Sequence, residues 1–272
     1  MYLIKSIVDI LIIILLLRLL ITPAEAYFNP VYRLIFRITD PILTPSTYVT
    51  KSAVTGVILT VLSLVVIRGL IYVGISKTPI VIALGISFYD LVRFLFQAYM
   101  VLWFVSVLAQ RSYGISFANL IERAFVPLNV ISHRFGISRR RFHLFAFLFL
   151  LFAYAVLSTI ARLCIVQKSV LSLSLAVQAL GEGLILFLAL FPFPGFFSLV
   201  IIASALLSWV SPDPSNPLVQ AIYSISEPLL RPFRRFVPLL GGLDLSPIAA
   251  LLVFQFGGAL GQQLIAGFLR MV

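Results

Sequence analysis

Four charged residues near the end of the chain have the types and the spacing for binding phosphate groups. Glu227, Arg231 and Arg235 recur every four residues, and Arg234 lies beside them. On a helix this spacing places one carboxylate and three guanidinium groups on one polar face. An exposed ion pair of this kind contributes only about 0.2–0.5 kcal/mol, whereas guanidinium groups match the geometry of phosphate. We therefore expect these arginines to bind anionic lipid headgroups.

Further arginines are clustered between apolar runs and are predicted to bind lipid or a partner protein in the same way. The chain has 20 basic and 9 acidic residues, a net charge of +11. It has neither zinc-ligand spacing nor an aromatic and basic RNA-binding motif, so we expect no nucleic-acid partner. We expect anionic membrane lipids, other integral membrane proteins or further copies of this chain as partners. The remaining predicted lipid- or partner-binding residues are Arg33, Arg37, Arg139, Arg140 and Arg141.

The residues that most often carry catalysis are scarce. His133 and His143 are the two histidines and have no partner at metal-ligand spacing, and Cys164 is the single cysteine, so no intrachain disulfide forms. The sequence has no GxSxG, HExxH or Walker motif. We therefore predict a protein that is not an enzyme, with no catalytic residues, no cofactor and no metal site.

Charged residues inside apolar runs are the strongest indication of transport. Asp90, Arg93 and Gln97 are spaced to share one stripe of a helix. A charge at the bilayer centre costs about 2.5–3.5 kcal/mol, so it marks a functional site unless it lies at the membrane surface. Two interpretations stay open, an ion pathway and a structural ion pair near the surface. Arg18, Arg68 and Arg162 are expected to extend toward the surface from the ends of their helices.

The elements that carry these residues are membrane helices. Apolar residues make up 61% of the chain and charged residues 11%, with a mean hydropathy of +1.13. Soluble domains have about 45–50% apolar residues and about 25% charged residues. About 20 apolar residues cross a bilayer. The first run also has features of a signal peptide, with Ala24-Glu25-Ala26 resembling a cleavage site. The apolar runs cover residues 3–22, 52–75, 79–110, 143–165, 170–191, 193–211 and 245–270.

Two segments between these runs repeat one another. NPVYRLIFRITDPILTP begins at Asn29 and NPLVQAIYSISEPLLRP begins at Asn216, and the apolar residues of both recur at offsets 2, 6, 9 and 13. That spacing is one face of a helix, so both segments are predicted to lie in the membrane surface. The residues predicted to define this motif are Asn29, Pro30, Asp40, Pro41, Asn216, Pro217, Glu227, Pro228, Asp244, Ser246 and Pro247.

Proline and its preceding residue predict where the helices of the last copy begin. Asn216 is expected to cap a helix that has Pro217 at its first position, and Ser226 or Glu227 is expected to do the same before Pro228. The segment should therefore be two short helices joined by a bend, and Ser246 should cap a further helix. In that last helix Gly257 and Gly261 form a GxxxG pair, which predicts close packing against another helix.

A third, degraded copy is recognised when Ile115 is placed at offset zero, because Pro127 then aligns with Pro41 and Pro228. The predicted fold is an all-α polytopic membrane protein with about six transmembrane helices in three repeats, each made of a helix, an amphipathic segment and a helix. Repeat 1 covers residues 1–76 with its interfacial segment at 28–45. Repeat 2 covers 77–166 with its segment at 115–136. Repeat 3 covers 167–272, and within it 170–191 is expected to be interfacial or re-entrant.

The distribution of lysine and arginine predicts the topology. The three loops that hold the repeats carry 12 of the 20 basic residues. By the positive-inside rule all three loops should face the cytoplasm, with both termini outside. This arrangement requires residues 170–211 to cross the membrane once in net, with a break at Phe191-Pro192-Phe193-Pro194-Gly195.

The segment 205–252 resembles the YggT family of small integral membrane proteins. It contains the elements SW, DPSNP, EPLLRPxRR and GGxDLSP, while 10–50 match partly and 100–130 faintly. Familiar members resemble two such repeats in a shorter chain, so the middle copy is a departure. The resemblance implies a bacterial inner-membrane protein linked to osmotic or ionic stress tolerance, with plastid relatives linked to cytochrome assembly. We expect a scaffold or assembly factor of a membrane complex, with an ion or osmolyte pathway as the alternative.

Overall fold

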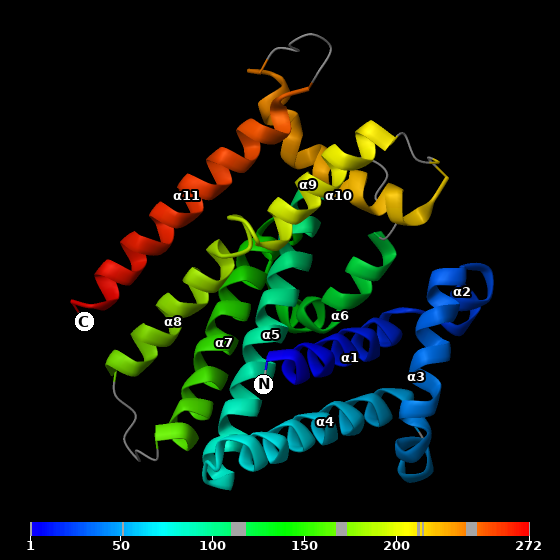
Figure 1. The fold of residues 1–272 in the computed structure, drawn as a ribbon, viewed down its shortest axis with the longest axis vertical. Helices are drawn as coiled ribbons and strands as arrows, with labels where there is room; N and C mark the ends of the chain where they lie inside the picture. The colour runs from blue at the N-terminus through cyan, green and yellow to red at the C-terminus, as the bar shows by residue number, and fades with distance from the viewer. Residues whose placement is uncertain are drawn as a thin grey trace. The chain divides into compact units, whose positions relative to one another are not determined.

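The computed structural model describes residues 2–50, 52–109, 118–166, 173–210, 213, 215–237 and 244–271, and their regular elements are helices (Figure 1). In chain order the elements are α1 (Tyr2–Leu20), α2 (Pro23–Phe28), α3 (Pro30–Val49), α4 (Ala53–Ser76), α5 (Ile80–Ala109), α6 (Ala118–Arg134), η1 (Arg139–Arg141), α7 (Phe142–Val166), α8 (Leu173–Leu188), α9 (Phe196–Val210), α10 (Pro217–Arg234) and α11 (Ser246–Leu269).

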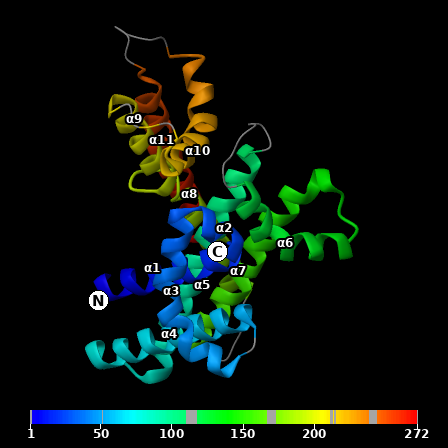
Figure 2. The same cartoon turned by 90° about the vertical axis from the view of Figure 1, so that its right-hand side faces the viewer.

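The helices form two compact units. Unit 1 contains residues 1–94 and 157–171, and unit 2 contains residues 95–156 and 172–272, so the boundary passes through α5 and α7. Within unit 1, α1 and α4 lie side by side and α3 packs against both of them (Figure 1). Within unit 2, α8 lies along α11, and α9, α10 and α11 form one group (Figure 2). The three-repeat organisation stays a prediction.

Four of the described helices are long and apolar enough to cross a membrane. These are Ala53–Ser76, Ile80–Leu108, Arg139–Ile165 and Ser246–Leu269. The apolar helices Ser174–Leu188 and Phe196–Val210 are shorter, at about 22 Å each by the helical rise. The chain is therefore a polytopic helical protein of membrane composition, whereas the predicted number of six spans is not confirmed.

The first and last interfacial segments form continuous helices with the same beginning. The side chain of Asn29 accepts a hydrogen bond from the Val31 amide, and that of Asn216 accepts one from the Leu218 amide, both at 2.9 Å. Each helix has proline at its first position, so the capping prediction is confirmed.

The predicted bend in the last copy is wrong, because α10 continues through Pro228 and Pro232, and α3 continues through Pro41 and Pro45. The two prolines of each helix are four residues apart, so the hydrogen bonds that they remove lie on one side of the helix. The other sides keep their backbone ladder. Ser226 is consequently inside α10 and its hydroxyl donates to the Tyr223 carbonyl at 3.5 Å instead of capping.

The start of α11 also differs from the prediction. The Ser246 hydroxyl is buried and has no hydrogen-bond partner among the described residues. Instead the Asp244 carboxylate, two residues earlier, accepts a hydrogen bond from the Ser246 amide at 2.9 Å. Asp244 therefore supplies the polar group that the sequence had assigned to Ser246, and Pro247 follows within the first turn.

The face that each interfacial helix buries is displaced from the predicted apolar stripe. Thr39 and Ser226 occupy the same offset in α3 and α10, and both are fully buried. Leu43 and Leu230, four residues later, are buried in the same way. Val31 and Leu218, at the start of the predicted stripe, are exposed. A pair formed by a small hydroxyl residue and a leucine thus anchors each helix, while part of the apolar stripe remains available to lipid.

Candidate functional site

A buried guanidinium group lies at the centre of unit 1. Arg68 in α4 is 0% exposed, and its Nη1 donates to the Asp9 carboxylate of α1 at 2.8 Å. Its Nε donates to the Ser87 hydroxyl at 3.0 Å and its Nη2 donates to the Ser87 carbonyl of α5 at 2.5 Å. The Ser87 hydroxyl in turn donates to the Val65 carbonyl of α4 at 2.7 Å. Arg68 therefore joins three helices through one side chain.

A second carboxylate lies close to this group. The Tyr72 hydroxyl, one turn beyond Arg68, donates to Asp90 of α5 at 3.3 Å, and Tyr72 interacts electrostatically with Arg68, Asp90 and Asp9. The structure thus assembles two carboxylates, a guanidinium and a phenol within helices of membrane composition. Such an arrangement can hold charge where water is scarce.

The network corrects one prediction and refines another. Arg68 was expected to extend toward the membrane surface, but it is eight residues from the end of α4 and has buried partners instead. In the predicted stripe, Asp90 belongs to the network, whereas Arg93 is exposed and Gln97 belongs to unit 2. A signal was present in the sequence, since Asp9 and Arg68 are opposite charges in two separate apolar runs.

The acid before the middle proline of each interfacial helix binds an arginine. In unit 1, Asp40 pairs with Arg18 of α1 at 2.5 Å, and the same guanidinium donates to Thr39 at 2.6 Å and lies over the Phe36 ring. Arg18 therefore binds α3 rather than the membrane surface, which corrects the prediction for it. Arg162 lies over the Tyr89 ring, with 5.7 Å from its Cζ to the ring centroid.

In unit 2 the corresponding acid binds an arginine of its own helix. Glu227 accepts hydrogen bonds from Arg234 at 2.6 and 2.7 Å, and Arg234 also donates to Asp244 at 2.9 Å. Partial burial acts to lower the pKa of Arg234, but the hydrogen bonds and charges of Asp244 and Glu227 raise this pKa above its ordinary value. Arg234 is therefore occupied by two carboxylates and ties α10 to the start of α11.

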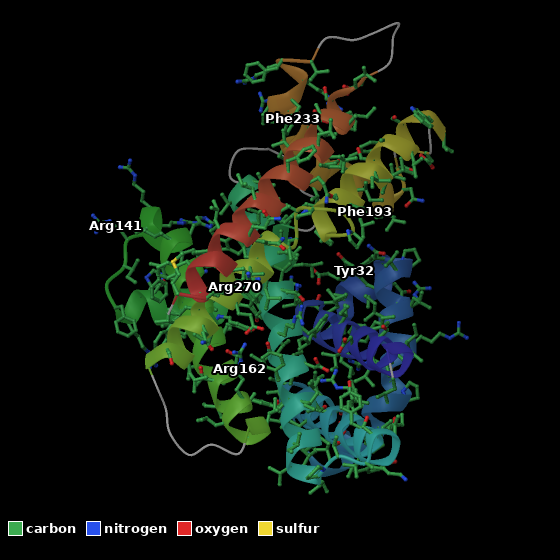
Figure 3. All side chains as sticks on the ribbon, turned by 60° about the vertical axis from the view of Figure 1, so that its left-hand side comes forward. Tyr32, Arg141, Arg162, Phe193, Phe233 and Arg270 are labelled. Atoms are coloured by element: carbon green, nitrogen blue, oxygen red, sulfur yellow. The ribbon has the colours of Figure 1, made fainter. Side chains whose placement is uncertain are left out.

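The remaining predicted lipid-binding arginines are exposed. Within the part of the chain that the structure describes, the side chains of Arg231 and Arg235 form no ion pair. Arg33 donates to the Tyr27 carbonyl at 2.5 Å, and Arg37 is exposed on the same helix. Arg139, Arg140 and Arg141 form η1, and Arg141 lies at the outer edge of the helices (Figure 3). These side chains have the exposure that contact with a headgroup requires.

The glycine prediction is right in part. A Cβ on Gly261 would lie 2.9 Å from a Leu188 methyl group of α8, so this position does permit close packing. A Cβ on Gly258 would lie 2.5 Å from the Pro192 ring, whereas one on Gly257 would meet nothing within 4 Å. The contact therefore uses Gly258 and Gly261, three residues apart, and Gly257 faces outward. Phe193, in the connection that follows α8 (Figure 3), donates its amide to Gln255 of α11 at 3.1 Å.

The two histidines line one cavity of about 610 Å³ in unit 2, together with Glu122 and Arg139. Among the described residues, no group of three histidine, cysteine, aspartate or glutamate side chains has the arrangement to hold a metal ion.

The fold and these buried charges define a class, a polytopic helical membrane protein with proline-containing amphipathic helices between its apolar ones. Residues 183–265 match the family model described as CCB3/YggT. The predicted resemblance to the YggT family is confirmed for this part of the chain, which runs from within α8 into α11.

Similar proteins come from several bacteria. The chain is 55% identical to PA0392 of Pseudomonas aeruginosa over 60 residues, 22% of this chain and 29% of that protein. It is 33% identical over 120 residues, 40% of this chain and 58% of the relative, to a Vibrio alginolyticus protein named for the proC 3′ region. It is 41% identical over 54 residues to YggT of Escherichia coli, 20% of this chain and 28% of YggT. Each match covers less than two thirds of the relative, and no solved structure matches the chain.

Proposed function

We propose that this protein is a non-enzymatic membrane scaffold that stabilises a complex of integral membrane proteins, in a bacterial inner membrane with its repeat loops in the cytoplasm. The observation that carries the proposal is the outward face of α11. Of the most apolar window of α11 only 11% is buried, against 39% for α4. The exposed side chains recur every four residues, along a ridge that winds round part of the helix and is called the exposed stripe below: Ile248, Leu252, Phe256, Leu260, Leu264 and Phe268.

The composition of this face favours a helix as its partner. Gly257 lies beside the stripe with open space around it, so a second helix can approach the backbone there. The opposite side of α11 is already in contact with α8 through Gly258 and Gly261. The domain thus holds α11 in place from one side and leaves the other side available.

Anionic lipid is the second proposed partner. Arg231 and Arg235 are exposed at the end of α10, close in sequence to the Arg234 contact that orients this segment against α11. Juxtamembrane basic residues contribute about 1 kcal/mol each toward an anionic surface. These arginines would orient the domain on the cytoplasmic leaflet.

Photo-crosslinking in intact membranes tests the scaffold proposal. A photoreactive amino acid in place of Phe256 or Leu264 should give the same protein adduct, because both lie on the exposed stripe. The same photoreactive amino acid in place of Leu62, which is 49% exposed on α4, serves as a control at another exposed helix and should not give that adduct. Lipid adducts alone at Phe256 and Leu264 would contradict the proposal.

The buried network in unit 1 favours a second candidate, an ion or osmolyte pathway. Asp9, Arg68 and Asp90 carry charge inside apolar helices, as the gating and coupling residues of transporters do. Reconstituted vesicles should then show a flux that Asp90→Asn abolishes and that Arg93→Gln, an exposed charge on the same helix, leaves unchanged. A flux that is absent, or that both variants reduce equally, would exclude this pathway.

A further inference from the structure

A half-enclosed cavity lies where three helices of unit 2 end or begin. Its volume of about 610 Å³ is within the range of about 300–1,000 Å³ that is typical of small-molecule sites. Ser106 comes from the last turn of α5, and Ile137 comes from the connection between α6 and η1. The other lining residues belong to α6, η1 and the start of α7. The apolar part of its lining consists of Ile121, Phe125, Val126, Ile137 and Phe142.

The polar part of the lining contains both signs of charge. Glu122, His133 and Arg139 line the cavity, and none of their side chains forms a hydrogen bond or ion pair with another residue in the described ranges. His143 also lines it, and its Nδ1 is buried without a partner. A buried polar atom that remains unpaired costs about 1–3 kcal/mol, so the Nδ1 of His143 indicates a ligand that pairs with it. The side chains of Glu122 and Arg139 are exposed at the same cavity and offer one negative and one positive charge to that ligand.

The depth of the cavity in the membrane follows from the elements that form it. Arg139 is the first residue of the span Arg139–Ile165, and His143 is four residues further on. On the other side α6 is amphipathic, with Ile121, Ala124 and Leu128 buried and Glu122 exposed. The end of a span beside an amphipathic helix is the level of lipid headgroups.

We propose that this cavity binds the headgroup of a zwitterionic phospholipid that carries a primary amine. The guanidinium of Arg139 pairs with the phosphate, and the carboxylate of Glu122 accepts from the ammonium group. A headgroup without an amine could still pair its phosphate with Arg139, but it would leave the carboxylate of Glu122 without a cation. The apolar wall of Phe125, Val126 and Phe142 receives the first carbons of the acyl chains. This inference is independent of the scaffold proposal, because it concerns another site and another lipid class.

The protein contains its own reporter for this binding. Trp103 of α5 donates its indole N–H to the backbone carbonyl of His143 at 2.8 Å, so it contacts a residue of the cavity lining. The chain has two tryptophans, and Trp209→Phe leaves Trp103 alone. The full-length protein in lipid-free detergent micelles is titrated with short-chain phosphatidylethanolamine, and the Trp103 emission is followed. We expect a saturable change.

Three variants separate the cavity from the charged surface. Arg139→Gln and Glu122→Gln should each weaken binding about tenfold, the effect of losing one charge-assisted hydrogen bond. Arg140→Gln changes the net charge as Arg139→Gln does, but Arg140 does not line the cavity. The affinity of the Arg140→Gln protein for phosphatidylethanolamine should therefore stay unchanged. Helical content and size-exclusion profiles verify that the variants fold. An equal loss in Arg139→Gln and Arg140→Gln would overturn the proposal.

Two further probes identify the ligand. Short-chain phosphatidylglycerol, which lacks the amine, should bind more weakly than phosphatidylethanolamine in the parent protein and equally well in Glu122→Gln. Free O-phosphoethanolamine should bind much more weakly than the lipid, because it has no acyl chains for the apolar wall. If O-phosphoethanolamine binds as tightly as the lipid, the site takes a soluble phosphate compound, and the lipid proposal is wrong.

Discussion

A single arginine in unit 1 illustrates how a membrane protein accommodates a buried charge. The guanidinium of Arg68 donates to a carboxylate, a hydroxyl and a backbone carbonyl from two neighbouring helices. A buried ion pair need not increase stability over an apolar pair of the same volume, because desolvation offsets the attraction. Its effect is geometric, since the partners on α1 and α5 fix the positions of both helices against α4.

Removing one side of this pair should therefore be costly. Arg68→Gln removes the buried cation that pairs with the partly buried carboxylate of Asp9, and we expect it to lower the free energy of unfolding by about 3 kcal/mol. Asp9→Asn in the same chain should restore part of that loss. The matched control is Arg18→Gln, whose partner Asp40 is 61% exposed and whose loss should cost under about 1 kcal/mol. Chemical unfolding in detergent measures both, and equal effects would contradict the buried network.

The arginines of α10 should separate by role, although they are neighbours in sequence. Arg231→Gln with Arg235→Gln removes two charges worth about 1 kcal/mol each, so it should weaken phosphatidylglycerol binding about thirtyfold and lower the amount that copurifies with the protein, while stability stays unchanged. Arg234→Gln should instead lower stability, because it breaks two ion pairs. Lipid mass spectrometry and thermal unfolding distinguish them. A lipid loss of the same size in Arg234→Gln alone would refute this separation.

Asp244 makes the start of α11 sensitive to acid. Its partial burial acts to raise its pKa, but the hydrogen bonds from Ser246 and the contact with Arg234 hold the pKa below its ordinary value. A carboxyl with a lowered folded pKa stabilises the protein above its unfolded pKa of about 3.9, and this contribution is lost as the pH falls through the folded pKa.

Asp244→Asn keeps an oxygen for the Ser246 amide but removes the charge. Above pH 5 the parent protein should therefore be more stable than Asp244→Asn by about 0.5–1 kcal/mol, a small value because Arg234 is 42% exposed. Thermal unfolding at pH 6 and at pH 2 measures the difference, which should become smaller as the pH falls. A difference that persists unchanged at pH 2 would show that the charge is not its source.

At the scale of elements, the sequence predicted the beginnings of helices better than their continuity. Asn before proline gave the first residue of α3 and α10, because the cap and the first-position proline are local in the chain. The same local rule failed at Pro228, where packing of Ser226 and Leu230 keeps the helix intact. Whether a proline ends a helix depends on tertiary contacts, which residue types do not specify.

The partners of charged residues could likewise be predicted from the sequence where they are local in the chain, and not where they come from another helix. The sequence placed Glu227 and Arg234 on one face, since both belong to one helix, and the structure pairs them. It did not predict the partners of Arg68, because Asp9 and Ser87 are 59 and 19 residues away in the chain. Apolar periodicity locates helices, but the rotation of one helix against another decides which polar residues meet.

The contact between α11 and α8 provides a test of such rotation. Gly258→Ala should destabilise the protein by about 1–3 kcal/mol, because its methyl group would overlap the rigid Pro192 ring. Gly257→Ala should be neutral or stabilising by up to about 1 kcal/mol, because the helix propensity of alanine is higher and the site is open. Unfolding measurements on the two variants form a matched pair, and the reverse order would mean that α11 is turned differently.

At the scale of the whole molecule, three proline-containing amphipathic helices separate the apolar ones. α3, α6 and α10 carry or adjoin most of the basic residues, and each has a proline inside it. The scaffold proposal requires that all three lie on the same leaflet, because only then do their arginines contact one anionic surface. This shared side is the central claim about the protein.

Cysteine accessibility tests that claim most directly. In a Cys164→Ser chain, single cysteines replace Arg33, Arg140, Arg235 or, as the opposite-side control, Lys77 in the turn after α4, and spheroplasts are treated with a membrane-impermeant maleimide. We predict that the cysteine at position 77 reacts in intact spheroplasts and that the other three react only after permeabilisation. Reaction of positions 33, 140 and 235 from different sides of the membrane would contradict the account.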